Sequence, residues 1–151
     1  MADSARLGVA VDDPYLVALG RAVYCFAALE WRAVLCVQKI AEKGHNPATS
    51  RHYLESVAAK TAGQIARDFM TATNGIIHPA LRVAVQPAAD RFRALTERRN
   101  DLVHATPGTA ANGDQRLFLK GAEWTIADVE ALSDKFAECN IRLNDLYSKV
   151  I

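Results

Sequence analysis

Apolar residues recur at alternating steps of three and four along four long stretches of the chain. This spacing is typical of helices that bury one face. Helices of about 20–30 residues with short connections pack side by side, each antiparallel to the next. We therefore predict an all-α fold, an antiparallel four-helix bundle (up-down) with a small β-hairpin or extended loop before the last helix.

Capping residues predict where the helices begin and end. The first helix is expected from Asp13-Pro14, an N-cap followed by proline, to about Lys43. The second is expected over residues 50–70 and the third over 79–104. Both rest on apolar periodicity, and a turn signal at Asn74-Gly75 separates them.

The stretch 106–124 does not follow the helical pattern. Asn112-Gly113 is a turn signal, and residues 116–120 have the pattern of a strand, so a small hairpin is expected. Thr125 and Asp128 then form a capping box that opens the last helix.

Three residues interrupt the helical patterns. Gly63 weakens the second helix, so we expect it to mark close packing against another helix. Pro87 is expected to kink or split the third helix. Glu30 lies within about 40° of Val23 and Phe26 on the apolar stripe of the first helix, where a carboxylate is costly without a partner.

Length and composition limit the class of protein. The 151 residues fit a single domain spanning residues 1–151, and 50% hydrophobic with 23% charged residues is a globular composition. The net charge of +1 argues against a protein that coats duplex DNA. Cys25, Cys36 and Cys139 have no metal-binding spacing, so we expect reduced thiols in a cytoplasmic protein, with no membrane span.

The residues best suited to chemistry lie at the end of the third predicted helix. Arg99 interrupts an apolar stripe, and Asn100 and His104 are four apart on one helix face. An arginine can clamp phosphate oxygens, and an imidazole moves protons near neutral pH. The same residues also suit a solvated basic helix end, so spacing alone leaves both interpretations open.

The segment from Arg99 to His104, RNDLVH, resembles the motif of the HEPN superfamily (higher eukaryotes and prokaryotes nucleotide-binding domains). That motif is an Arg and a His separated by four to six residues, often with a polar residue after the Arg. Residues 26–30 and 60–65 also resemble members of this group. The resemblance covers about residues 12–150 and is strongest at 91–105.

The resemblance implies an all-α bundle that dimerises and, in active members, a metal-independent endoribonuclease without a cofactor. The catalytic residues would be Arg99, Asn100 and His104, with Glu30 and Asp101 in supporting positions. The ribose 2′-OH would attack the adjacent phosphate and leave a 2′,3′-cyclic phosphate.

Two functional interpretations follow from the resemblance. One is an endoribonuclease acting as a toxin or in defence, and a toxin would have an antitoxin protein as partner. The alternative is a non-catalytic HEPN module that binds a protein or a nucleotide, with Arg99 holding Glu30. Thr106 stands where toxins paired with a nucleotidyltransferase carry Tyr, so regulation through AMPylation of that Tyr is not expected.

RNA would need a local basic patch, because the chain as a whole is nearly neutral. Arg91, Arg93 and Arg98 crowd the third predicted helix and are the expected RNA-binding residues. Further basic residues on the second predicted helix are Arg51, Lys60 and Arg67. A solvated basic face is the competing explanation. No metal site is expected, since the other histidines are scattered.

A homodimer is the expected assembly. Beside its main stripe, the first helix carries four further apolar residues, which are Cys25, Leu29, Cys36 and Ile40. They exceed what one face of an isolated bundle can bury. A two-fold dimer would also supply both the acid and the base, because one chain offers only one well-placed histidine, His104.

Overall fold

The protein is described by a computed structural model over residues 10–151. Over these residues it forms five α-helices, α1 (Asp13–Glu42), α2 (Tyr53–Ser56), α3 (Ala62–Asn74), α4 (Pro79–Val103) and α5 (Ile126–Lys149). A 3₁₀ turn, Val57–Ala59, follows α2. The sheet consists of β1 (Thr106–Thr109), β2 (Gln115–Leu119) and β3 (Ala122–Trp124). The predicted helical class is confirmed, and the hairpin is a three-stranded antiparallel sheet in the order β1-β2-β3.

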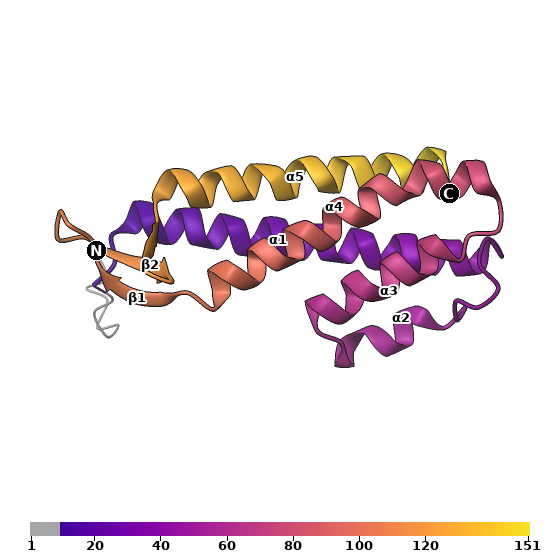
Figure 1. Cartoon of the computed structure of the whole chain (residues 1–151), viewed down its shortest axis with the longest axis horizontal. Coiled ribbons are helices and arrows are strands. Elements are labelled where there is room, and N and C mark those ends of the chain that lie inside the picture. Colours follow the sequence, from indigo (N-terminus) through magenta and orange to yellow (C-terminus); the bar gives the residue numbers. More distant parts are fainter. Residues whose placement is uncertain (1–9) are drawn as a thin grey trace, which may run out of the picture.

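The helices do not follow the predicted up-down order. Helices α1 and α5 lie side by side along the long axis and run in the same direction, while α4 crosses them in the opposite direction (Figure 1). The Tyr15 hydroxyl donates to the carbonyl of Trp124 at the start of α5, and Lys39 bonds the carbonyl of Tyr147 near its end. In an up-down four-helix bundle the first and last helices would run in opposite directions.

The difference in helix direction arises in the segment predicted to be the second helix. Residues 50–70 are not one helix, because the chain is extended at Lys60 (φ −100°, ψ 145°) and a new helix begins after Thr61. Thr61 and Gln64 form a capping box that opens α3. The short α2 segment therefore returns the chain across the molecule and lets α3 run in the direction of α1 (Figure 1).

A buried amide on α1 holds this returning segment. The Gln38 side chain donates to the carbonyl of Arg51 at 2.7 Å and accepts from the N–H of Leu54 at 3.1 Å. Because these bonds satisfy backbone groups of a loop, they favour the loop over continuation of a regular helix.

The other local predictions had mixed outcomes. The last helix begins at the predicted capping box, and α4 continues through Pro87 without a break. The N-cap of α1 is Asp12 and not Asp13, since the Asp12 carboxylate accepts from the N–H of Tyr15. The prediction for Gly63 is wrong, because a Cβ there would meet no atom closer than 4.0 Å.

The core is one continuous cluster that reaches all the longer helices. Its centre is aromatic: Phe26 lies 5.1 Å from Phe136 and 6.3 Å from Phe92, measured between ring centroids. Val23, predicted to share the inner stripe of α1 with Phe26, is instead exposed. The buried face of α1 instead carries several alanines, and α1 packs mainly on α5 and α3.

The apolar residues proposed for a dimer interface are mostly internal. Leu29, Cys36 and Ile40 are fully buried within the protomer, and Cys25 is partly buried. The broad core uses both flanks of α1, so these residues are not left over for a partner. Among residues 10–151, no helix combines the length and apolar character needed to cross a bilayer.

Candidate active site

The carboxyl end of α4 presents the predicted catalytic residues. Arg99 and Asn100 lie in its last two turns, and His104 is its C-cap, with its N–H bonded to the carbonyls of Asn100 and Leu102. The His104 side chain is exposed, and its imidazole has no hydrogen bond or ion pair with any residue from 10 to 151. The imidazole is thus accessible to a substrate.

Arg99 points toward α1 and lines a cavity of about 230 Å³ between α1, α4 and α5. Its guanidinium carbon lies 5.2 Å from the centroid of the Phe26 ring, a cation–π arrangement. Its Nη1 donates to Oδ1 of Asn100 at 3.0 Å. Within residues 10–151 no carboxylate lies within 4.0 Å of this guanidinium, so its charge is not neutralised by direct contact.

Glu30 lines the same cavity from α1. The side chain is partly buried, and desolvation raises the pKa of its carboxyl group, while attraction to Arg99 opposes the rise. The predicted proximity of Glu30 and Arg99 is therefore confirmed. The two side chains do not form an ion pair within 4.0 Å, because Arg99 bonds Asn100 and packs on Phe26.

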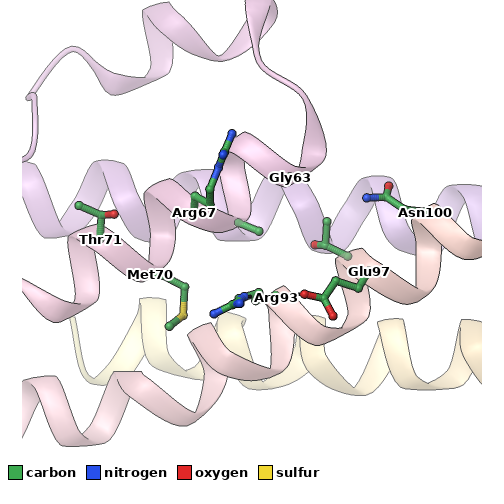
Figure 2. A pocket seen from close by; sticks show the side chains of 9 residues that line it. Gly63, Arg67, Met70, Thr71, Arg93, Glu97 and Asn100 are labelled. Atoms are coloured by element: carbon green, nitrogen blue, oxygen red, sulfur yellow. Dashed lines mark ion pairs between the residues drawn. The ribbon is translucent and has the colours of Figure 1, made fainter.

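Asn100 connects this cavity to a second hollow. Its Oδ1 accepts from Arg99, and the same side chain lines a groove of about 560 Å³ between α3 and α4. Figure 2 shows this groove, with Met70 and Arg93 reaching toward each other and Asn100 at its far end. The groove is lined by Gly63, Ala66, Arg67, Met70, Thr71, Arg93, Thr96, Glu97 and Asn100.

The predicted RNA-binding residues of α4 do not form one patch. Arg91 is exposed on the part of α4 near Cys139 of α5, and Arg93 lines the α3–α4 groove. Arg98 turns toward the sheet, where it lies over the Trp124 ring and pairs with Asp101 at 3.2 Å. Arg93 lies about 140–160° around the helix from the other two, while Arg91 and Arg98, seven residues apart, lie on nearly the same side but are separated along α4 by about two turns. Asp101 thus supports Arg98 rather than the catalytic residues.

The basic residues predicted on the second helix also separate. Lys60 pairs with Asp68 at 2.9 Å, and Arg51 lies in the loop before α2. Only Arg67 reaches the groove beside α4.

Of the groove residues on α4, the sequence analysis named Arg93 and Asn100 but missed Thr96 and Glu97, and a signal for Glu97 was present. Arg93, Glu97, Asn100 and His104 are spaced by four, three and four, which places them on one face of α4. This stripe of polar residues could have been recognised as a surface turned toward another helix. Thr71 and Met70, which complete the groove from α3, carried no such signal.

Comparison with known proteins adds no relative, since no family model, curated protein or solved structure matches the chain. Within residues 10–151, no three His, Cys, Asp or Glu side chains come together as a set of metal ligands. The site therefore offers an arginine, an amide, a carboxyl group and an imidazole.

Proposed function

We propose that the protein is a metal-independent endoribonuclease with a HEPN-like helical bundle. The observation that carries this proposal is the state of Arg99, which lines an open cavity without a carboxylate in direct contact. Asn100 touches this guanidinium, and the exposed His104 follows one turn later. An arginine without a carboxylate in direct contact and an accessible imidazole at the end of the same helix suit the binding and cleavage of a phosphodiester.

The proposed reaction uses the ribose 2′-OH as the nucleophile. Its oxygen attacks the adjacent phosphorus, the bond to O5′ breaks, and the products are a 2′,3′-cyclic phosphate and a 5′-OH. His104 moves a proton as general acid or base, which is worth about 10²–10⁴-fold in rate. Arg99 stabilises the charge of the phosphorane, and Asn100 orients the guanidinium or a phosphate oxygen.

A second copy of the chain would supply the second imidazole. The reaction needs an acid and a base, and the site proposed in one protomer contains a single imidazole, that of His104. Exposed Val23 and Val103 rim the Arg99 cavity, so a two-fold partner on this face would bring both sites together. We infer a cytoplasmic homodimer that acts as a toxin or a defence enzyme, with an antitoxin as partner if it is a toxin.

One observation favours the alternative of a non-catalytic module that binds a protein or a nucleotide. The Arg99 guanidinium already contacts Asn100 and Phe26 within the protomer, as a structural arginine would. The two functions differ in what happens to RNA, because only the nuclease breaks the phosphodiester bond.

The test is cleavage of a mixed-sequence RNA in the presence of EDTA. Wild type should cleave it and leave 2′,3′-cyclic phosphate ends, whereas Arg99→Ala and His104→Ala should lose at least about 10²-fold in rate. The matched control is His78→Ala, since His78 is also an exposed histidine at an end of α4 and makes no side-chain cap. Circular dichroism should show unchanged helix content in all variants.

The proposal fails if His104→Ala still cleaves at the wild-type rate. It also fails if pure wild type leaves every RNA intact, in which case the binding module is favoured.

A further inference from the structure

The α3–α4 groove has two arginines that are open to an anion. Arg67 has no carboxylate within 4.0 Å among residues 10–151. Arg93 pairs with Glu97 at 3.8 Å, but both side chains are more than half exposed. An exposed pair of this kind contributes about 0–1 kcal/mol, so Arg93 can exchange Glu97 for a phosphate.

The floor of the groove is mostly apolar and open. Gly63, Ala66 and Met70 line it from α3. Gly63 has no side chain and Ala66 has only a methyl group, so space remains between the two helices at these positions. A flat base can lie against such a surface, with methionine as an adaptable apolar contact. The amide of Asn100 stands at one end of the groove, where it can bond a base or a sugar (Figure 2).

The groove leads to the proposed catalytic residues. One face of α4 carries Arg93, Glu97, Asn100 and His104. Helix α3 packs beside this face only as far as about Gly63. Beyond that point α4 continues uncovered by α3 toward β1 (Figure 1). A strand lying along this stripe would pass from the two arginines to Asn100 and then to His104.

We propose that the α3–α4 groove binds single-stranded RNA, one base resting on its apolar floor and the flanking phosphates contacting Arg67 and Arg93. The proposal rests on the ribonuclease function proposed above, and it assigns the groove as the site that positions the strand beside Arg99 and His104. Arg67, Arg93 and Gly63 are binding and positioning residues and take no part in bond cleavage.

The experiment measures binding separately from cleavage. The probe is a fluorescent 2′-O-methyl RNA of about ten nucleotides, a length that matches single-strand sites of about 4–16 nucleotides. Its blocked 2′-oxygen cannot attack phosphorus, so the wild-type protein can be titrated by fluorescence anisotropy at several salt concentrations. Arg67→Ala and Arg93→Ala should each weaken binding about tenfold. Each should also reduce the slope of log K against log salt by about 0.7.

Two further variants test the shape and the charge of the groove. Gly63→Leu fills the floor, and it should weaken binding without changing the salt slope, because it removes no charge. Glu97→Gln should strengthen binding, because it removes the carboxylate that competes for Arg93. The matched control is Arg142→Ala, an exposed arginine on α5 outside the groove, which should bind like wild type.

The groove proposal is overturned if wild type does not bind the probe, or if Arg67→Ala and Arg93→Ala bind as tightly as Arg142→Ala. Cleavage of unmodified RNA is scored in a separate assay. If wild type binds RNA through the groove but never cleaves it, the groove proposal stands and the nuclease proposal fails. If wild type cleaves RNA but the groove variants bind normally, the nuclease proposal stands and the groove proposal fails.

Discussion

Glu30 and Arg99 face one cavity without forming an ion pair, and this arrangement changes the pKa of the Glu30 carboxyl group. Burial raises the pKa of the Glu30 carboxyl group above its ordinary value of 4.5, and the nearby Arg99 only partly offsets this. The folded protein therefore binds a proton at Glu30 more readily than the unfolded chain does. The free energy of unfolding must fall as the pH rises from about the ordinary pKa through the raised one.

Replacing Glu30 by Gln tests this directly. The amide has the same shape and carries no charge, so Glu30→Gln should raise the melting temperature at pH 7, above the ordinary pKa of 4.5, where the cost of burying the carboxyl group lowers the stability of the wild type. Below the ordinary pKa of 4.5 both proteins are neutral at this position, and their melting temperatures should converge. Calorimetry at both pH values measures this difference.

Glu138→Gln, at an exposed position on α5, is the matched control and should show no comparable effect. A lower melting temperature for Glu30→Gln at pH 7 would contradict the structure, since it would mean that the Glu30 carboxylate gains more from Arg99 than burial costs it.

At the residue scale the sequence predicted positions but not contacts. Helical spacing correctly brought Glu30 and Arg99 toward one interior, because angles on a helix follow from residue numbers. It could not show that the guanidinium would lie on the Phe26 ring and bond Asn100. That choice depends on side-chain conformations and on the packing of three helices, which spacing does not contain.

Among the elements, α3 has a capping signal in the sequence that was sufficient to predict where the helix begins, but the prediction did not use it. Thr61 and Gln64 form a capping box as readable as that of Thr125 and Asp128, and it marks the true start of the helix. The α2 segment had no such signal. It is held by Gln38, a residue of another helix, so only the tertiary structure explains its path.

Gln38→Leu should therefore destabilise the protein. The leucine leaves the carbonyl of Arg51 and the N–H of Leu54 without their partner, which costs about 1–3 kcal/mol. Urea denaturation measures the loss. Gln86→Leu is the control, because the Gln86 amide bonds only the exposed side chain of Asp90 and should change stability by less than about 0.5 kcal/mol. Equal effects of both variants would show that Gln38 does not hold the segment.

Gly63 gives a prediction of opposite sign. A methyl group there meets nothing closer than 4.0 Å, and alanine favours the helix, so Gly63→Ala should raise the free energy of unfolding by about 0.5–1 kcal/mol. Gly108→Ala is the contrasting variant, since its Cβ would come within 2.8 Å of the Phe118 ring and should destabilise β1. A destabilised Gly63→Ala, measured by the same denaturation, would mean that α3 packs closely at this position after all.

At the scale of the whole molecule, the directions of the helices determine which surfaces stay exposed and can contact a partner. Helices α1 and α5 run in parallel, and the sheet closes one end through Tyr15, whose hydroxyl donates to Trp124 and accepts from the N–H of Leu117. The outer side of α1 stays uncovered and carries Val17, Tyr24 and Trp31, all more than half exposed. They recur every seven residues, a spacing that suits contact with another helix.

The last prediction joins assembly to activity. If two copies of His104 complete the proposed active site, cleavage per protomer should rise with protein concentration in step with the fraction of dimer seen by sedimentation. Val23→Arg puts a charge at the exposed rim of the Arg99 cavity, the face proposed for the two-fold partner, and should lower both quantities together. Lys135→Glu, on the exposed side of α5, is the control and should change neither. Cleavage that is independent of concentration in a monomeric protein would show that a single His104 suffices, and that the second proton transfer uses water or another group of the same chain.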